Sequence, residues 1–414
     1  MMGPRLVGRQ NRKGSIVMFI VMFMALLALL PVGMQLIQVS ARNTKQFLNY
    51  NVEADNVARA GMTDAISWFQ RQSVQPVRSN SNPVLYPYPD AAFMPIQSSG
   101  TVTDTIDSTI GLVKEYALSD QTSLYARYEV KRQQDPGTNP IDPRAVHDIT
   151  DQRIDNGTAG QGLAWLIQST GYVYQRKNSA VAYNVAPNVI VGSARVSTEI
   201  RRIALTLPLN AALITNNRTQ TTLNNNGRAM GQAFYGMGYY TGGSGPTISG
   251  GGSQLTGTAG TKAAIGSGPN VSFNGIFGVT RNELKLMADI AVSTFTDMPF
   301  QYPQMAVVYV NCNADFDATR PLRGGGILFV NGTLTLEAGS NTYFGGIIYA
   351  TGAIVVHGPA TINGVVVGES SITLDGFGDV AEVDYDNNIL NAVRQTAGQY
   401  RENKATFFNF TSNS

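Results

Sequence analysis

Residues 14–41 of the chain read GSIVMFIVMFMALLALLPVGMQLIQVSA and decide how the protein begins. The run carries no charged side chain, and as a helix it is long enough to cross about 30 Å of hydrocarbon. Basic residues precede it with no acidic residue among them, namely Arg5, Arg9, Arg12 and Lys13. Because positive charge holds its side of a membrane helix in the cytoplasm, the sequence predicts a single-pass inner-membrane location. The amino terminus would be cytoplasmic, and the remainder would lie in the periplasm or at the cell surface.

The leader is compatible with two cleavage sites. Lys13-Gly14-Ser15 ends the basic segment, and cleavage after Gly14 would leave the apolar helix on the mature protein. A secretory signal is instead cut at small residues after its apolar region, and residues 39–41 (Val-Ser-Ala) offer such a site. The length of the apolar run favours cleavage after Gly14, while cleavage near Ala41 would release a secreted protein.

An amphipathic helix is expected to follow the apolar run. Residues 41–72 lack proline, and apolar side chains recur at helical spacing. These are Phe47, Leu48, Val52, Val57, Ala58, Met62, Ala65, Ile66 and Phe69. We therefore expect one helix from Ser15 to about Arg71, about 85 Å long at 1.5 Å per residue. Pro31 and Gly33 predict either a flexible point that suits a helix leaving a bilayer for a filament, or an ordinary kink of a membrane helix.

These features resemble those of type IV pilin-like proteins. The segment NVEADNVARAGMTDAISWF (51–69) is similar to the corresponding helix of PilX-type minor pilins and of the large minor pseudopilin of type II secretion. The segments LAWLIQSTGYVYQRKNSA (163–180) and VSTEIRRIALTLPL (196–209) resemble the strand pair that follows this helix. The resemblance implies a non-catalytic filament subunit that acts in initiation, at the tip or in surface adhesion.

The resemblance also implies partners and processing. A prepilin peptidase would cut after Gly14, and Ser15 would become the N-methylated first residue. Other pilin-like subunits and an inner-membrane assembly platform would be the partners, together with a surface or polysaccharide ligand. Most major pilins carry glutamate at the fifth mature position, where this chain has Phe19. Without that carboxylate the subunit suits a filament tip or initiation complex better than the repeated shaft.

Composition limits the other function classes. Charged residues make up only 14% of the 414 residues and the formal net charge is +2, with no basic cluster typical of a nucleic-acid surface. The single cysteine, Cys312, excludes an intrachain disulfide. With 43 glycines and many Asn, Thr and Ser residues, the chain has the composition of a turn-rich β protein.

Sequence patterns divide the chain into five regions. The expected boundaries are a leader at 1–14, a helix at 15–73, a pilin-like α+β region at 74–208, a Gly/Asn/Thr/Ser-rich stretch at 209–275 and a solenoid module at 276–414. Alternating segments in the third region predict a small antiparallel sheet packed on the amphipathic helix. The fourth region is expected to be either a flexible linker or a set of irregular solenoid rungs.

The carboxy-terminal region predicts stacked β rungs. Residues 324–376 alternate short β-branched runs with glycines, and Gly346, Gly352, Gly358 and Gly364 are six residues apart. This repeat favours a β-solenoid with glycine at its corners over a β-sandwich. A helix is expected at 281–295, with Thr280 as its N-cap and Glu283 completing a capping box, and a terminal helix would cap the open end. The overall fold class is thus predicted to be α+β with a carboxy-terminal solenoid.

Few residues point to chemistry. The two histidines, His147 and His357, are isolated, which argues against zinc. An acidic segment at 374–386 contains a candidate weak Ca²⁺ site, formed by Asp375, Asp379, Asp384 and Asp386, although its spacing matches no EF-hand and a solvated turn is favoured. We expect no catalytic residue and no cofactor.

Two alternatives to a filament subunit remain open. One is a permanently membrane-anchored envelope protein whose solenoid binds polysaccharide. The other is a secreted β-helix carbohydrate-active enzyme, with the acidic segment in its groove.

Overall fold

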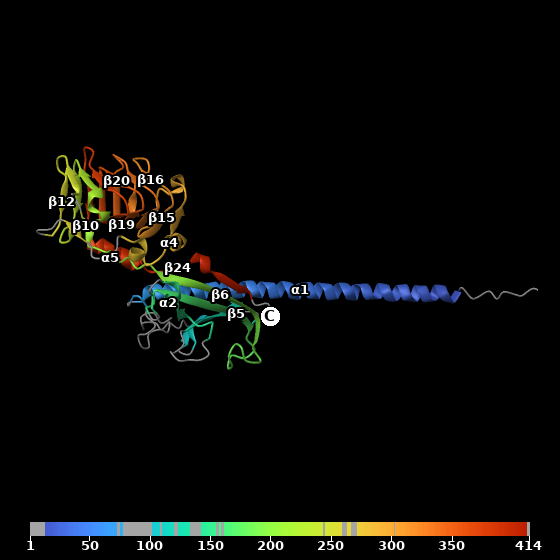
Figure 1. The fold of residues 1–414 in the computed structure, drawn as a ribbon. Helices are drawn as coiled ribbons and strands as arrows, with labels where there is room; N and C mark the ends of the chain where they lie inside the picture. The colour runs from blue at the N-terminus through green and yellow to red at the C-terminus, as the bar shows by residue number, and fades with distance from the viewer. Residues whose placement is uncertain are drawn as a thin grey trace, which may run out of the picture.

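A computed structural model shows a long helix, an antiparallel sheet and a stack of parallel strands (Figure 1). It describes residues 13–72, 75–77, 102–107, 110–119, 123–132, 142–154, 157–158, 161–242, 245–258, 263–265, 271–301 and 303–411. The strands form sheets of eight, eleven and six members. The α+β class expected from the sequence is therefore wrong: the described chain is mostly β, and its eleven- and six-stranded sheets are parallel.

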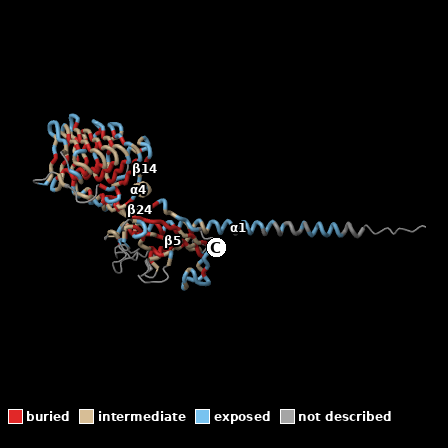
Figure 2. Tube along the Cα trace, viewed as in Figure 1, coloured by how far each residue is buried: buried red, intermediate tan, exposed pale blue. Residues whose placement is uncertain are grey.

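The helix α1 covers Lys13–Arg71 and continues through Pro31. Its first half projects away from the rest of the molecule, and its second half lies on the antiparallel sheet (Figures 1 and 2). Among the residues that the structure describes, no helix combines the length and the apolar character needed to cross a bilayer. That finding contradicts the expected single-pass location in the inner membrane.

The antiparallel sheet packs against the second half of α1. Its strands are β1 (Val102–Asp107), β2 (Gly111–Ser119), β3 (Leu124–Lys131), β4 (His147–Asp148), β5 (Ala164–Gln175), β6 (Val189–Arg202), β24 (Tyr400–Glu402) and β25 (Phe408–Thr411). Side chains alternate across a strand, so Ala126, Tyr128 and Val130 of β3 are buried together on one side. They join Val57 and Met62 of α1 in one core.

The last two strands of this sheet come from the end of the chain. After β6 ends at Arg202, the chain leaves the sheet and returns at Tyr400, the antiparallel partner of Arg202. The β25 strand then pairs with β6 farther along, from Phe408 opposite Ser197 to Thr411 opposite Ala194. The parallel module is thus an insertion between two paired strands, whereas the sequence predicted a carboxy-terminal module.

The insertion consists of short strands and helices. Its strands are β7 (Ala211–Asn217), β8 (Thr221–Asn224), β9 (Gly227–Met230), β10 (Tyr235–Thr241), β11 (Thr247–Ser249), β12 (Gln254–Thr256), β13 (Ala263–Ile265), β14 (Ile290–Val292), β15 (Ala306–Val310), β16 (Ala314–Phe316), β17 (Arg323–Val330), β18 (Leu334–Leu336), β19 (Thr342–Ala350), β20 (Ile354–His357), β21 (Ala360–Gly368), β22 (Ile372–Asp375) and β23 (Ala381–Asp384). The α-helices are α3 (Phe273–Phe277), α4 (Arg281–Met287) and α5 (Asn387–Thr396), with α2 (Thr150–Arg153) outside the insertion. The 3₁₀ helices are η2 (Arg218–Gln220), η3 (Phe295–Asp297) and η4 (Lys404–Thr406).

Among the described residues, all strand pairs of the insertion are parallel, and their stacking order differs from their order in the chain. Along one side the order is β14, β15, β17, β19, β21, β7, β10 and β13. The chain therefore enters at β7 in the middle of the stack and builds outward to β13. It then returns at the opposite end with β14 and builds back to β23, which pairs with β9. The segment β7–β13 and the segment β14–β23 therefore pair with each other in the middle of the stack, through β7 with β21 and β9 with β23.

Glycines mark the corners of the rungs. The strands β17, β19 and β21 bend at Gly326, Gly346 and Gly364, which have φ of +124°, +146° and +142° and stack on one another. Ile327 pairs with Ile347 and Ile347 with Val365, so successive rungs advance by 20 and 18 residues. The six-residue spacing seen in the sequence therefore separates corners within a rung.

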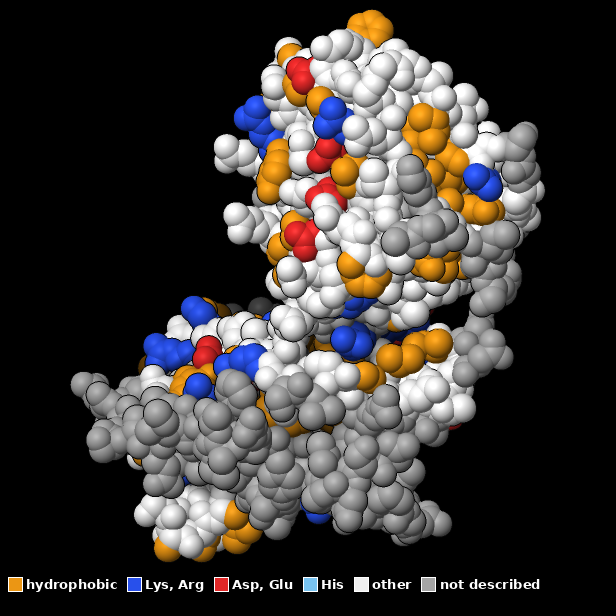
Figure 3. Space-filling view, turned by 90° about the vertical axis from the view of Figure 1, so that its left-hand side faces the viewer, with side chains coloured by type: hydrophobic (Ala, Val, Ile, Leu, Met, Phe, Trp, Pro, Cys, Tyr) orange, Lys and Arg blue, Asp and Glu red, His pale blue; other side chains and the backbone are white. Residues whose placement is uncertain are grey.

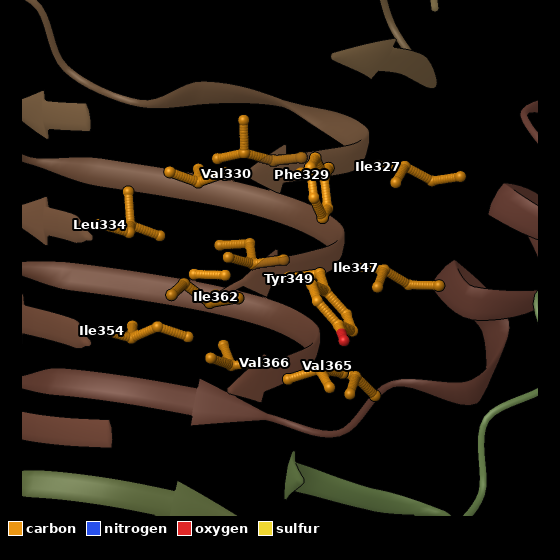
Figure 4. Close-up of a cluster of buried hydrophobic side chains, with 14 of the residues drawn as sticks. Ile327, Phe329, Val330, Leu334, Ile347, Tyr349, Ile354, Ile362, Val365 and Val366 are labelled. Atoms are coloured by element: carbon orange, nitrogen blue, oxygen red, sulfur yellow. The ribbon is translucent and has the colours of Figure 1, made fainter. Parts of the chain in front are cut away.

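Apolar side chains from successive rungs form the core of the stack (Figure 4). Phe329 and Tyr349 lie one above the other, with ring centroids 5.6 Å apart. Residues such as Ile347, Ile354 and Val366 are at most 1% exposed. A continuous core of this kind stabilises rungs that are not stable individually.

Two local expectations differ from the structure, and one open alternative is decided. The region 209–275, expected to be either a linker or irregular rungs, supplies β7–β13, so its described residues are rungs of the solenoid. The helix expected at 281–295 ends at Met287, because strand β14 follows at Ile290. The terminal helix α5 lies against β19 and β21, near the middle of the stack, and caps neither end.

The insertion point allows a direct test of modularity. Replacing residues 203–399 by Asn-Gly is expected to leave α1 and the first sheet folded, because Arg202 and Tyr400 already face each other and Asn-Gly favours a two-residue hairpin. A cooperative thermal transition in circular dichroism, with the full chain as reference, measures this.

The matched control is a truncation after Arg202. It removes β24, β25 and the Tyr400 ring, which is fully buried and lies 5.3 Å from the Phe69 ring. Loss of a buried aromatic costs about 3–5 kcal/mol, so the truncated variant is expected to unfold at a much lower temperature. Equal stability of the two variants would contradict the discontinuous sheet.

Candidate functional site

The expected processing site lies at the start of α1. Lys13, Gly14 and Ser15 fall within the first turns of this helix, which begins at Lys13. Their side chains lie outside what the structure describes, as do residues 1–12. The prediction of cleavage after Gly14 is therefore not tested by the fold.

Residues Met18–Met24 of α1 form a continuous apolar surface. Its large apolar residues are exposed to 74% at Met18 and Phe19, 54% at Ile20, 61% at Val21, 63% at Met22, 59% at Phe23 and 65% at Met24. Seven consecutive residues make almost two helical turns, so these side chains point in every direction around the axis. A helix that is apolar all round is normally buried on all sides.

The other predicted helix residues lie on this same segment. Phe19 is exposed, and Pro31 is exposed inside the continuous helix. Gly33 lies one turn of helix or less from Pro31 and is also helical. Farther along, Val52 is still 62% exposed, whereas Ala54 is fully buried. The free part of α1 therefore ends at the edge of the antiparallel sheet.

Close packing holds the second half of α1 in place. Gly171 of β5 lies directly below α1, where an added Cβ would come within 2.1 Å of the Ala54 carbonyl oxygen. The Tyr128 hydroxyl donates a 2.5 Å hydrogen bond to Asp64, and the Phe69 ring lies 5.2 Å from that of Trp165. The exposed half of α1 is thus carried on a rigidly held base.

Ion pairs and backbone hydrogen bonds connect the sheet to the solenoid. Arg201 of β6 lies 2.5 Å from Glu283 of α4, and Arg401 lies 2.7 Å from Asp289. The Ala204 amide donates to the Phe277 carbonyl oxygen at 2.8 Å. Since the Arg201 side chain is only 5% exposed, its pairing with Glu283 is shielded from water and sensitive to loss of either partner.

The acidic residues singled out in the sequence do not converge. Figure 3 shows acidic side chains in a row down one side of the solenoid. Each of the four predicted residues accepts hydrogen bonds from the protein itself: Asp375 from Asn225, Asp379 from the Val380 amide, Asp384 from Gln232, and Asp386 from the first amides of α5. Within the described ranges, no group of three or more His, Cys, Asp or Glu side chains could hold a metal ion.

The histidines and the cysteine are also separate from one another. His147 Nδ1 lies 2.9 Å from the Ala145 carbonyl oxygen, and the His357 ring packs edge-on against Phe377 at 5.5 Å. Cys312 is partly buried, and burial raises the pKa of its thiol. A thiol that stays protonated is a poor nucleophile.

A tyrosine–arginine cluster on the sheet was not anticipated. It lies on the side of the sheet away from α1 and contains Glu115, Tyr125, Arg127, Glu129, Tyr172, Tyr174, Arg176 and Tyr183. The Arg176 guanidinium lies 4.0 Å from the Tyr125 ring centroid, and Arg127 lies 4.7 Å from that of Tyr183.

The members of this cluster are satisfied by one another. Burial raises the pKa of Tyr172, and the Glu129 carboxylate raises it further. The Tyr-x-Tyr and Arg-x-Glu alternation in β5 and β3 was the available sequence signal, because period-two residues share one face of a sheet. We interpret the cluster as a clamp that holds the loop containing Tyr183 against the sheet.

Comparison with known proteins adds one weak likeness. No protein-family model and no curated protein matches the sequence. Among solved structures, the chain is similar to the crystal structure of the competence-associated pilin ComZ from Thermus thermophilus. The two chains are 11% identical with a TM-score of 0.22, over 88% of this chain and 97% of the other.

Proposed function

We propose that this chain is a non-catalytic, minor pilin-like subunit of a type IV pilus or type II secretion-type filament, processed after Gly14. The observation that carries the proposal is the first half of α1, which stands clear of the folded modules with apolar side chains exposed on every side. The leader and helix segments that resemble minor pilins support the same proposal.

A bundle of like helices is the partner that fits this surface. A flat partner surface would cover one stripe of the helix and leave Met18–Met24 partly in water, whereas surrounding helices cover the full circumference. Burying one large apolar side chain contributes about 1.5–3 kcal/mol, so this short segment alone supplies a strong driving force. The proposed partners are therefore the first helices of other pilin-like subunits.

Phe19 supports a proposal for the position of the subunit in the filament. In a helical bundle the glutamate of a major pilin would pair with the amino group of a neighbouring subunit, and an unpaired buried charge is costly. Phe19 offers no such carboxylate. The subunit is thus proposed to act in filament initiation or at the tip, where that pairing is not required.

The solenoid supplies the proposed recognition surface. The Arg201–Glu283 and Arg401–Asp289 ion pairs connect it to the antiparallel sheet. Thr373, Thr222 and Thr247 lie at equivalent outward positions of three successive rungs and form a short polar row. We propose that this module binds a cell surface or polysaccharide, which is adhesion without chemistry.

Recovery of the protein from sheared filaments tests the proposal. The mature chain is expected to begin at Ser15, N-methylated, and to depend on the host prepilin peptidase. The Phe23→Glu variant is expected to be lost from the filament fraction, because it buries an unpaired charge in the helix bundle. Intact mass and immunoblotting of the filament and cell fractions measure both results.

The control variant is Phe377→Glu, since Phe377 is 69% exposed on the solenoid and Phe23 is 59% exposed on α1. It is expected to enter filaments like the unmodified chain. A mature start at Arg42 would favour the secreted enzyme, and an uncut Met1 would favour a permanent anchor. Either start, or equal recovery of the two variants, would overturn the proposal.

A further inference from the structure

One end of the solenoid leaves an interior apolar column uncovered. On the side of the stack formed by β16, β18, β20, β22, β8 and β11, one inward position is occupied in successive rungs by Phe316, Leu336, Val356, Leu374, Leu223 and Ile248. The first five are at most 1% exposed, whereas Ile248 of β11 is 48% exposed. The core therefore reaches the surface at β11.

The opposite end of the same column is closed by the chain itself. The Phe295 ring of η3 packs edge-on against Phe316, with centroids 4.9 Å apart. The Arg320 guanidinium holds this segment by donating to the carbonyl oxygens of Phe295 and Thr296, at 2.7 and 3.2 Å. The contrast indicates that the Ile248 end is left open for an occupant.

The edge strand at the open end is short, and its three residues are exposed. Thr247, Ile248 and Ser249 are all exposed, and among the described residues β11 pairs only with β8. The following corner is fixed by hydrogen bonds from the Asn225 and Asn226 amides to the carbonyl oxygens of Ser249 and Gly251. Edge strands that avoid pairing are often very short or carry charged residues or proline; β11 has three residues, follows Pro246 directly and carries no charge.

Charge indicates which occupant fits. The chain has no charged residue from Tyr239 to Thr261, the stretch that contains β11 and β12. In a two-fold symmetric contact every residue near the axis meets its own copy, so any charge there would face a like charge. An uncharged edge with one exposed apolar side chain is complementary to itself.

We propose that β11 pairs antiparallel with β11 of a second copy of this chain, so that the two Ile248 side chains cover one another. The cap of Phe295 and Arg320 at the other end blocks head-to-tail stacking, which leaves a closed dimer. In Figure 1 the β12 end of the solenoid lies away from the free end of α1. The dimer therefore leaves both α1 helices accessible and does not depend on the proposed filament role.

Cysteine cross-linking of the full chain tests the contact. The background is Cys312→Ser, which removes the only native thiol, and the protein is kept in a non-ionic detergent that covers α1. In-register antiparallel pairing places the two middle residues opposite each other, within disulfide range. Ile248→Cys is expected to give a disulfide-linked dimer under mild oxidation. Phe300→Cys, 67% exposed near the closed end, is the control and is expected to stay monomeric.

A second measurement keeps the test independent of thiol reactivity. In sedimentation equilibrium, Ile248→Lys is expected to raise the dimer dissociation constant about tenfold or more, because a like charge then faces itself. Thermal unfolding of this variant should match the parent, since Ile248 is half-exposed. Equal cross-linking of the two cysteine variants, a monomeric parent chain, or a dimer unaffected by Ile248→Lys would each overturn the proposal.

Discussion

Replacing Gly346 by alanine is expected to unfold the solenoid. Gly346 has φ of +146°, a region essentially restricted to glycine, and an added Cβ would lie 2.0 Å from the Gly326 carbonyl oxygen. The backbone at Gly326 has little room to move away, because it is packed equally closely on the next rung: a Cβ at Gly326 would lie 2.2 Å from the Ala306 carbonyl oxygen. We expect a loss above about 4 kcal/mol in the free energy of unfolding, measured by denaturant titration of the full chain.

Gly339→Ala is the matched control. Gly339 also has a positive φ, of +78°, but no atom lies within 4 Å of its added Cβ. This variant carries the backbone strain alone, at a cost of about 1–2 kcal/mol. If both variants unfold at the same denaturant concentration, close stacking of the corner glycines does not stabilise the solenoid as described.

Replacing Gly171 by alanine is expected to separate α1 from the antiparallel sheet. The new Cβ would lie 2.1 Å from the Ala54 carbonyl oxygen and 2.7 Å from the Ala58 amide nitrogen, both main-chain atoms of the helix. Relief requires the helix to move, which uncovers Val57 and Met62. We expect a loss of about 3–5 kcal/mol, comparable to deletion of a large core side chain.

Hydrogen exchange measures this prediction locally. Backbone amides of β5 and β3 are expected to lose protection in Gly171→Ala, while those of the solenoid strands keep theirs. Gly251→Ala serves as control, because no atom lies within 4 Å of its added Cβ and its φ is not in the left-handed region. Unchanged protection of β5 would show that α1 does not need the close approach at Gly171.

Local signals in the sequence predict the start of α4 but not its end. Thr280 and Glu283 were predicted to form a capping box, and both of its hydrogen bonds are confirmed. The end of that helix, predicted at residue 295, was wrong, because β14 continues the parallel stack from Ile290. Capping depends on four consecutive residues. The end of α4 depends instead on the pairing of the next strand, β14, with β15, and the residues near Met287 carry no signal for that pairing.

The candidate sites show the same limit. Acidic residues close in sequence were considered as one cation site, but along strand β23 and its flanks they point to different partners. The tyrosine–arginine cluster joins β2, β3 and β5 across the sheet, and its members are too far apart in sequence to be associated beforehand. Side-chain proximity across strands is a property of register, and register is settled by the whole sheet.

The sequence by itself determined the local elements: a helix from α1's apolar and amphipathic periodicity, short β-branched strands, and glycine corners at Gly346 and Gly364. Tertiary structure alone decided that the solenoid is inserted between β6 and β24, and that its rungs stack out of chain order. The physical reason is that periodicity records which face of an element is apolar, while parallel pairing depends on backbone groups that every residue carries. The stacking order of the rungs, and the exposure of Ile248 at one end, therefore depend on how all the rungs pack together into one core.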